Sequence, residues 1–551
     1  MGSERATDVV EEGRRALRAA HSTLDSLLRA VKVRSTSESA PAVDGGDPYQ
    51  QICYDAARSA AELAAAEELL VEADTSTLEG ELSLHFAARA IHGHQSRCGP
   101  AFAELRIDSA TPDETRFSTT QLSSTVEEAL GKRVLREGPR IGHDLLDGPH
   151  RLLRDSYRSF SDTVVRPLAE DIHRQDAAIP DAILDGLAEM GCFGLSIPER
   201  YGGLSRDAEP DCLSMLLATE ELSRGSLGAA GSLITRPEVL ARALLAGGTE
   251  EQKSEWLPKL ASGESLCAVA VTEPDHGSDV ASIQLRAVRS DEGWHLSGAK
   301  MWSTFAGRAH VLMVLARTGT EEQKHRGLSL FLVSKPSFDG HDFEVSQATG
   351  GSLKGRAIAT LGYRGMHSYE CAFDRFLVPP EALVGGDAGE GKGFYLTMAG
   401  FAGGRIQTAA RAVGVMQAAF EEALEYAHQR RTFGRPIADY QLIRIKLARM
   451  ASLLHGTRMY TYSAAALMDR GTGDVAASMA KLLASRAAEW VSREAMQIHG
   501  GMGYAEESAV SRYFVDARVL SIFEGSEEIL ALKVIARSLL EGLPEAKGAT
   551  S

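Results

Sequence analysis

Apolar residues recur at three- and four-residue spacing along most of the chain, which is the pattern of amphipathic helices. In the first 135 residues this pattern predicts a small, self-contained helical bundle with helices at 16–33, 49–73 and 77–105. A second helical block is predicted over residues 152–259, with helices at 152–173, 181–190, 211–224 and 237–245. The Gly-, Pro- and Asp-rich stretch 136–150 is predicted to link the two blocks.

At Leu266 the pattern changes to short β-branched and aromatic runs separated by turn residues, which predicts strands. These runs lie at 266–271, 283–289, 294–297, 310–316, 328–333 and 369–376. From about Gly393 the helical period returns, and three long helices with a shorter one after Gly525 predict an up-and-down four-helix bundle. The predicted fold is mainly α with an inserted β domain: an N-terminal helical extension (1–140), an α domain (150–263), a middle β domain (264–385) and a C-terminal four-helix domain (390–545).

Charge and cysteine content narrow the function classes. The 551 residues include 59 basic and 75 acidic side chains, for a formal charge of −16, and no long basic cluster occurs. Nucleic acid and anionic membranes are therefore not expected as partners. No apolar run approaches the length of a membrane span, and the six cysteines form no C-x-x-C pair, so we expect a cytoplasmic protein with reduced thiols.

No metal site is expected. His85, His92 and His94 lie in one predicted helix, and they belong to no recognised zinc-ligand motif. They are predicted to be ordinary surface or interhelical histidines.

Glu524 is the leading candidate for catalysis. It follows the apolar run Val519–Phe523 and precedes Gly525 and Ser526, which can open a helix. An apolar surround disfavours the charged form of a carboxylate and suits it to act as a base on a weakly acidic carbon. Taken alone, the same residue could be a solvated acid at the start of a helix, favoured by the helix dipole.

Two short sequence motifs in the β region and two glycine-containing loops contain further candidate site residues. Residues 271–280 run from a strand into a polar Gly/Ser/Asp loop, and Trp302 and Thr304 stand two apart on a predicted strand, so that both should point to one face. The indole could cover a flat ring system, or it could be a core aromatic. The loops 430–434 and 499–504 interrupt the C-terminal helices, and the glycines of the second allow backbone amides to approach a nucleotide.

Together, these motifs and the Glu524–Ser526 segment, in this order along the chain, resemble the motifs of the acyl-CoA dehydrogenase family. The resemblance covers residues 150–540. The resemblance implies FAD as cofactor, an acyl-CoA as substrate, an electron-transfer flavoprotein as partner, and a homodimer or homotetramer. It implies Glu524 as the catalytic base. Flavin contacts are implied for Val271, Thr272, Ser278, Trp302, Thr304, Ser526 and Glu528. Contacts to the FAD of a neighbouring subunit are implied for Arg430, Thr432, Phe433, Gln441, Gln497, Gly500 and Gly501. Substrate contacts are implied for Ser278, Arg405 and Gly525.

The implied reaction removes the α-proton of the thioester with Glu524 while the β-hydrogen leaves as hydride to the flavin. In the family, the backbone amide of the glutamate and a flavin hydroxyl polarise the thioester carbonyl. Some members carry the base just before the arginine that opens the first helix of the last domain. That position is Gly404 here, before Arg405, so Glu524 is the matching base.

The small apolar stretch 226–236 ends in Thr235 and Arg236, and an arginine there is either a surface residue or an anchor for a bound carboxylate. This stretch, the phrase 362–366 and the long extension resemble most the family members that oxidise (2S)-methylsuccinyl-CoA to mesaconyl-CoA in the bacterial ethylmalonyl-CoA pathway. Tyr363, Arg364 and Thr235 are possible helpers of Arg236. A dehydrogenase of short or branched acyl-CoA, an acyl-CoA oxidase and a flavin-binding scaffold without turnover remain alternatives.

Overall fold

A computed structural model describes residues 2–37, 49–108, 111–142, 146–206 and 211–544. The chain divides into two compact units. Unit 1 combines Met1–Arg151 with Thr408–Ser551, and unit 2 is Leu152–Gln407. Helix α6 (Gly148–Phe160) and helix α12 (Gly393–Gln429) each contribute residues to both units.

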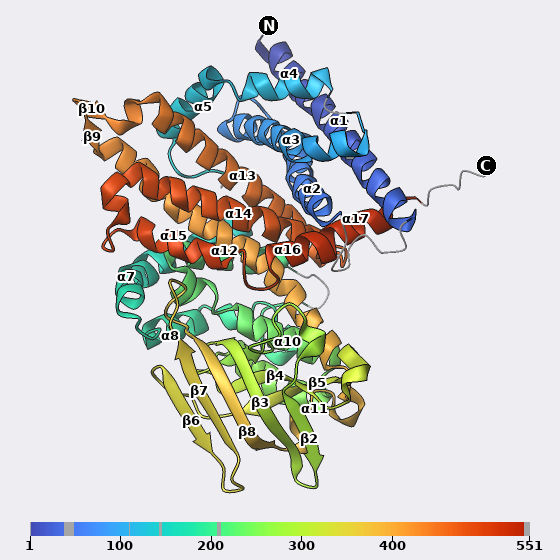
Figure 1. The fold of residues 1–551 in the computed structure, drawn as a ribbon. Coiled ribbons are helices and arrows are strands. Elements are labelled where there is room, and N and C mark those ends of the chain that lie inside the picture. The colour runs from blue at the N-terminus through green and yellow to red at the C-terminus, as the bar shows by residue number, and fades with distance from the viewer. Residues whose placement is uncertain (1, 38–48, 109–110, 143–145, 207–210, 545–551) are drawn as a thin grey trace. The chain divides into compact units, whose positions relative to one another are not determined.

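Unit 1 is helical apart from the short hairpin of β9 (Arg431–Thr432) and β10 (Arg435–Pro436). The extension holds α1 (Gly2–Ser37), α2 (Gln50–Val71), α3 (Leu78–Leu105), α4 (Pro112–Gln121) and α5 (Ser124–Glu137), and the later helices are α13 (Gln441–Asp469), α14 (Asp474–His499), α15 (Ala509–Val519), α16 (Glu527–Ile529) and α17 (Arg537–Gly542) (Figure 1). A π-helical segment, Leu530–Ala536, joins α16 to α17. The three predicted extension helices are confirmed, and the short helix predicted after Gly525 begins where expected.

Helices α4 and α5 were not predicted from the sequence. Thr111 caps α4 with a full capping box to Glu114, and Pro112 occupies the first turn. These residues are a recognisable helix start, whereas the helix that follows is mostly polar and carries a weak apolar pattern. The predicted linker is largely confirmed, since no regular element lies between the end of α5 and the start of α6 among the residues described there.

The extension is not the self-contained bundle that was predicted. Gly131 of α5 lies so close to α13 that an added Cβ would meet the Arg444 carbonyl oxygen at 2.2 Å, and a Cβ on Gly456 of α13 would meet the ring of Phe86 at 2.3 Å. The buried carboxylate of Glu127 binds Arg449 of α13 and His85 of α3. The extension and the C-terminal helices therefore share one core.

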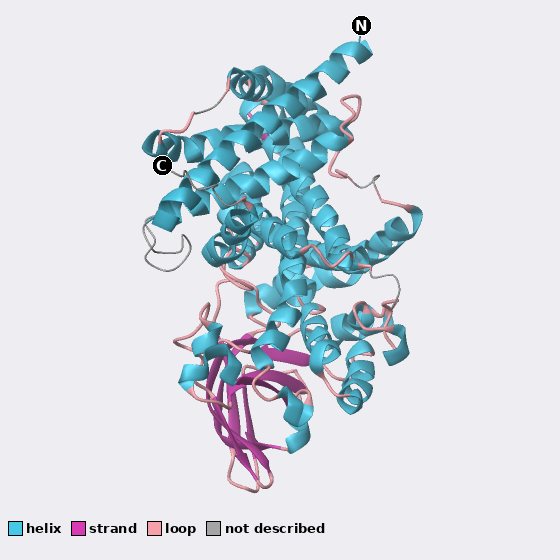
Figure 2. Cartoon of the chain, turned by 90° about the vertical axis from the view of Figure 1, so that its right-hand side faces the viewer, coloured by secondary structure: helices cyan, strands magenta, loops and turns pink. Residues whose placement is uncertain are grey.

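Unit 2 combines helices with one eight-stranded sheet (Figure 2). The helices are α7 (Arg166–Gln175), α8 (Asp181–Glu189), α9 (Cys212–Gly225), α10 (Thr235–Gly247) and α11 (Glu250–Ala261). The strands are β1 (Cys267–Ala270), β2 (Arg286–Ser290), β3 (Gly293–Thr304), β4 (Val311–Arg317), β5 (Leu328–Ser334), β6 (Asp342–Ser346), β7 (Ser352–Ile358) and β8 (Ser368–Val378). The order along the sheet is β1-β4-β2-β3-β8-β7-β6, with β5 paired to β4.

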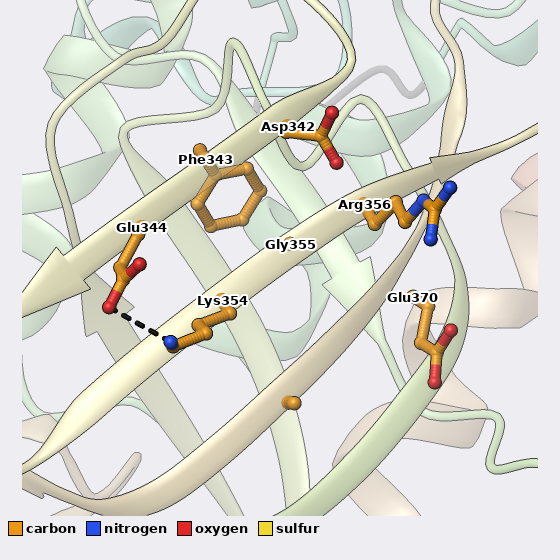
Figure 3. A pocket seen from close by; sticks show the side chains of 8 residues that line it. Asp342, Phe343, Glu344, Lys354, Gly355, Arg356 and Glu370 are labelled. Carbon is orange, nitrogen blue, oxygen red and sulfur yellow. Dashed lines mark ion pairs between the residues drawn. The ribbon is translucent and has the colours of Figure 1, made fainter.

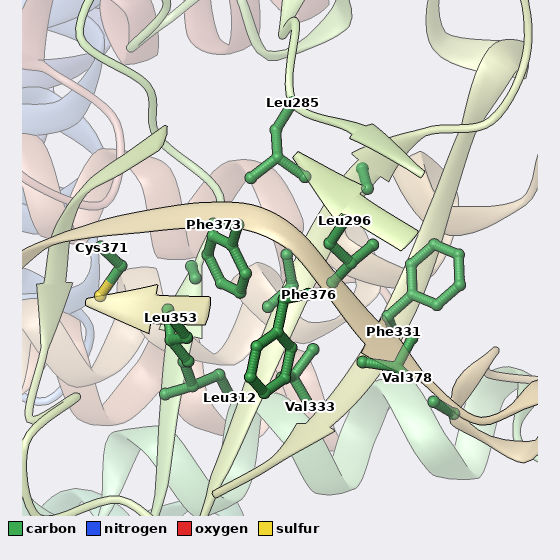
Figure 4. Close-up of a cluster of buried hydrophobic side chains, with 14 of the residues drawn as sticks. Leu285, Leu296, Leu312, Phe331, Val333, Leu353, Cys371, Phe373, Phe376 and Val378 are labelled. Atoms are coloured by element: carbon green, nitrogen blue, oxygen red, sulfur yellow. The ribbon is translucent and has the colours of Figure 1, made fainter. Parts of the chain in front are cut away.

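Strand β4 shows how the sheet buries both faces. Its residues Val311, Met313 and Leu315 join a cluster with Leu240 and Leu244 of α10 and with residues of α11. Its alternate residues Leu312, Val314 and Ala316 join a second cluster on the other face, which Figure 4 shows with Phe331, Phe373 and Phe376. Successive side chains of a strand point to opposite faces, so a continuous apolar run is the signature of a strand buried on both sides.

All six predicted strands are present, but β6 and β7 were missed. Both strands lie toward one edge of the sheet, and charged residues such as Glu344, Lys354 and Arg356 alternate with few buried ones. No helix in the described part of the chain is long and apolar enough to cross a membrane.

Candidate functional site

Glu524 sits in the turn between α15 and α16, in a left-handed conformation with φ of 54°. Its Oε2 accepts a hydrogen bond from the Thr408 hydroxyl at 2.8 Å, and its Oε1 accepts one from Arg411 Nη1 at 3.1 Å. The carboxylate side chain is 13% exposed and the Arg411 side chain is fully buried. The predicted apolar surround is therefore incomplete, because a buried cation and a hydroxyl each donate to one oxygen of the carboxylate.

Two side chains of α14 hold the turn that carries Glu524 by hydrogen bonds to its backbone. Lys481 Nζ donates to the Gly525 carbonyl at 2.5 Å, and Ser485 Oγ donates to the Leu520 carbonyl at 3.0 Å. Ser526 caps α16, as its sequence context predicted. Both Lys481 and Ser485 lie on α14, so this helix fixes the position of the carboxylate.

The backbone amide of Glu524 donates to no acceptor in the described residues. A buried or half-buried N–H group is nearly always paired in a folded protein. This amide is therefore available to a substrate oxygen next to the same residue's carboxylate.

The sequence analysis missed Thr408 and Arg411. They are three residues apart on α12 and so share one face of the helix. An arginine three residues after a threonine is not a recognised sequence motif. The contact of this pair with Glu524 is visible only in the folded structure.

In unit 2, Trp302 departs from the geometry predicted for it. The pairing of β3 with β8 shifts register between Lys300 and Ser303, and Trp302 has a left-handed φ of 59°. Trp302 is 52% exposed, whereas Thr304 is buried with its hydroxyl 2.8 Å from that of Ser368. The bulge interrupts the strict alternation on which the same-face prediction depended, and it presents an exposed indole, as a flat ligand would need.

The polar loop after β1 is fixed by an ion pair that was not predicted. Buried Lys300 donates to Glu273 Oε1 at 2.8 Å and to the Val271 carbonyl at 2.9 Å, and Glu273 also accepts from the amides of Gln284 and Leu285. Burial lowers the pKa of Lys300 to about 8, against the opposing effect of Glu273. The pair holds the backbone of Val271 and Thr272 beside β3, while Ser278 stays exposed.

The remaining candidates of unit 1 lie mostly on its surface. Phe433 is 97% exposed at the tip of the β9–β10 hairpin, near exposed Arg430 and half-buried Thr432. Gly500 and Gly501 have open space where a Cβ would lie. Gln497 and Glu528 are exposed, and Gln441 donates to Glu128 of the extension at 2.9 Å.

The stretch before Arg236 forms a π-helical turn, Leu227–Gly231, then α10. Gly228 packs against the backbone of Tyr363 and Arg364, where an added Cβ would meet a carbonyl oxygen at 2.3 Å. Arg236 is buried and makes one hydrogen bond within the described chain, from Nη1 to the Ser232 carbonyl at 3.0 Å. It is not a surface residue. Thr235 is engaged with Gln407, and Arg405 is half-buried.

The histidines of α3 have interhelical or surface positions, as predicted. Buried His85 contacts Glu127, buried His94 contacts Thr23 and His92 is exposed. In unit 2, His341 and His367 face each other at 3.0 Å beside Asp176. Arg364 Nε lies 3.6 Å from the Asp176 carboxylate.

A hollow of about 470 Å³ lies over the edge strands β6, β7 and β8 (Figure 3). Its charged rim includes the Lys354–Glu344 ion pair at 3.1 Å, and Phe343 covers Gly355. None of the predicted site residues lines it, so its size alone does not make it the active site.

Three family models match this chain in succession: "Acyl-CoA dehydrogenase, N-terminal domain" over residues 148–264, "middle domain" over 268–376 and "C-terminal domain" over 391–540. (2S)-Methylsuccinyl-CoA dehydrogenase of Cereibacter sphaeroides is 46% identical over 403 residues, which are 73% of this chain and 71% of that protein. The chain belongs to the acyl-CoA dehydrogenase family. It is an enzyme of that family, and the family's fold is preceded here by the helical extension.

Two solved structures extend the comparison. A glutaryl-CoA dehydrogenase in complex with glutaryl-CoA is 30% identical with a TM-score of 0.65, covering 72% of this chain and 96% of its own. A chain from the study of the electron transferring flavoprotein of Acidaminococcus fermentans is 30% identical with a TM-score of 0.64, covering 72% and 97%. Acyl-CoA dehydrogenases bind FAD, and the matched region includes every predicted site residue.

Proposed function

We propose that this enzyme carries out FAD-dependent α,β-dehydrogenation of (2S)-methylsuccinyl-CoA to mesaconyl-CoA, with Glu524 as the base. The observation that carries the chemistry is the Glu524 carboxylate, held in place by hydrogen bonds from Arg411 and Thr408 beside its own unengaged backbone amide. One residue thus offers a proton acceptor and a donor for the thioester carbonyl, the two groups that α-proton abstraction requires.

The residues of the chain have separable roles. Glu524 accepts the α-proton, and its backbone N–H stabilises the negative charge that develops on the thioester oxygen. Bound FAD supplies the acceptor for the β-hydride. The exposed indole of Trp302 would cover the flat ring of such a cofactor, and Thr304, Val271, Thr272, Ser278, Ser526 and Glu528 would be further contacts. Arg430, Thr432, Phe433, Gln497, Gly500 and Gly501 would reach the FAD of a neighbouring subunit. Gln441 would have to leave Glu128 to join them.

The substrate assignment rests on the 46% identity to a methylsuccinyl-CoA dehydrogenase and on Arg236. A distal carboxylate needs a cationic, hydrogen-bonding partner when it is bound away from water. Buried Arg236 has one donor engaged in the described residues and four that remain for a bidentate carboxylate. Arg405 and Gly525 complete the proposed substrate contacts.

The family membership supports a proposal for the partners, and the bacterial relative supports one for the location. We assign an electron-transfer flavoprotein as the electron acceptor, a homodimer or homotetramer as the assembly, and the cytoplasm as the compartment. The six cysteines, all free and buried, fit a reducing environment.

Anaerobic titration of the purified yellow protein with a panel of acyl-CoA thioesters tests the reaction and the substrate together. Methylsuccinyl-CoA should bleach the flavin at lower concentration than butyryl- or isobutyryl-CoA. Preference for a plain short or branched chain would point to an ordinary short-chain dehydrogenase. Rapid peroxide formation in air would indicate an oxidase, and no bleaching by any thioester a scaffold.

Replacing Arg236 tests the carboxylate anchor. Arg236→Ala should reduce kcat/KM for methylsuccinyl-CoA by about tenfold or more, since a charge-assisted pair contributes roughly 1.5–3 kcal/mol. The rate with isobutyryl-CoA should change little. An unchanged preference between the two thioesters would remove Arg236 from the substrate site.

A further inference from the structure

A cavity of about 300 Å³ lies inside unit 1, where α2 and α3 of the extension meet α13 and α14. Four arginines line it: Arg58 of α2, Arg89 and Arg97 of α3, and Arg486 of α14. Its other lining residues are mostly apolar and include Trp490, and Glu62 is the single acidic residue among them. This concentration of positive charge stands out in a chain whose formal charge is −16.

Carboxylates of the protein account for two of the four arginines. Arg97 binds Glu62 at 2.5 Å, and Arg486 binds Glu527 at 2.8 Å. Arg58 and Arg89 form no ion pair within 4.0 Å with any acid in the described chain. They face aromatic rings instead, Tyr54 at 5.7 Å and Trp490 at 5.9 Å.

Four arginines around one pocket repel one another, which costs folding free energy when the pocket holds only water. Arginine remains charged in proteins, so a partly buried cluster cannot relieve its repulsion by losing a proton. Burial and the neighbouring charges of Arg486 and Arg97 lower the pKa of Arg58. A bound anion would remove this penalty and satisfy the planar guanidinium groups.

We propose that this arginine pocket binds a small, multiply charged oxyanion, either a phosphate-bearing molecule or a polycarboxylate. Its volume is at the lower end of the range of ligand pockets, which suits a compact anion better than a whole nucleotide. The ligand contacts residues of the extension and of α14 at once, so its binding stabilises the packing of the extension on the C-terminal helices.

The site is independent of the catalytic proposal. No cavity-lining residue contacts Glu524, Arg411 or Thr408 among the hydrogen bonds of the described chain. A failure of anion binding would leave the dehydrogenase assignment untouched, and the reverse also holds.

Calorimetry and thermal unfolding of the full-length protein test the proposal, with pyrophosphate and citrate as probes and sodium chloride as the control at equal ionic strength. We expect one of the two anions to bind once per chain with a Kd below about 1 mM and to raise Tm. The preferred probe distinguishes a phosphate ligand from a polycarboxylate. Sodium chloride should reproduce neither effect.

Arg58→Gln and Arg89→Gln should each weaken that binding at least about tenfold, since each removes a charged donor. Arg136→Gln is the matched control, because Arg136 is an exposed arginine of the same extension. If a Gln variant does not fold, Arg58→Lys keeps the charge without the planar fork and should still bind more weakly than the wild type. The proposal is overturned if neither anion binds below about 5 mM, or if the pocket variants bind as the control does.

Discussion

At the scale of single residues, Arg411 and Thr408 fix the carboxylate of Glu524, which we propose as the base, in a half-buried turn. The guanidinium donates to one carboxylate oxygen, and the threonine hydroxyl donates to the other. Arg411 and Thr408 act through Glu524, so they are positioning residues.

Glu524→Gln should leave thioester binding intact and reduce turnover by about a thousandfold or more, since general-base catalysis contributes roughly 10²–10⁴ in rate. Single-turnover flavin reduction measures the chemical step directly. Full turnover by this variant would exclude Glu524 as the base.

Arg411→Gln should lower kcat by about tenfold, because a hydrogen bond to a charged group contributes roughly 1.5–3 kcal/mol. Single-turnover flavin reduction should slow, while thioester binding should change little, because the carboxylate loses one of the two donors that orient it. Thr408→Val is the control: it removes a hydroxyl but no charge, and it should slow the reduction less. Equal rates for both variants would contradict the positioning role of Arg411.

At the scale of elements, the apolar pattern predicted the long helices and the buried strands, because a buried face leaves a period in the sequence. It could not predict β6 and β7, whose outward residues are charged, or α4, which is mostly polar. Helix α5 carries Val126, Leu130 and Val134 at helical spacing and was overlooked. Glu524 and Trp302 were predicted as site residues from short sequence motifs. Arg411, Lys481 and the Glu273–Lys300 pair were not, because their partners lie far away in the chain.

The Glu273–Lys300 pair should be required for the loop after β1. Glu273→Gln leaves a buried ammonium group without its carboxylate, which typically costs about 3–5 kcal/mol. Thermal and denaturant unfolding should show a less stable protein, and flavin retention should fall with it. The double variant Glu273→Gln/Lys300→Met should be less damaged than the sum of the single variants. Additive effects would show that the pair is not coupled.

His94 should make the extension sensitive to acid. Burial, aided by Arg97 and His21, lowers its pKa from 6.5 to about 4. Between these values the unfolded chain binds more protons than the folded one, so stability falls as pH drops from 6.5 to 4, by about 3 kcal/mol in total. The unfolding free energy of His94→Gln, measured against pH, should lack this part of the slope. An identical slope would show that His94 is not the titrating group.

At the scale of the whole molecule, unit 1 is built from both ends of the chain. Lys32 of α1 donates to the carbonyls of Leu540 and Leu543 at 2.9 and 2.7 Å, so the first helix caps the last one. The close approaches at Gly131 and Gly456 show the same dependence in the core.

Gly131→Ala should separate α5 from α13, because the new methyl group would lie 2.2 Å from the Arg444 carbonyl oxygen. Overpacking of this kind costs about 1–3 kcal/mol. Limited proteolysis should then cut the extension faster. Gly99→Ala is the matched control, since it is also helical but has nothing within 4 Å of the added group. Equal cleavage of the two variants would argue against tight docking.

Because unit 1 is formed by two separate parts of the chain, its first part is synthesised long before its second. The 256 residues of unit 2, Leu152–Gln407, are translated between the two halves of unit 1. The 303 residues that separate the end of α5 from the start of α13 take roughly 15–60 s to synthesise at about 5–20 residues per second, so α1 to α5 are complete that long before α13 begins. During that interval their apolar faces lack the surface that later buries them, while unit 2 can already fold. The extension is therefore the part of the nascent chain with the greatest need for a chaperone.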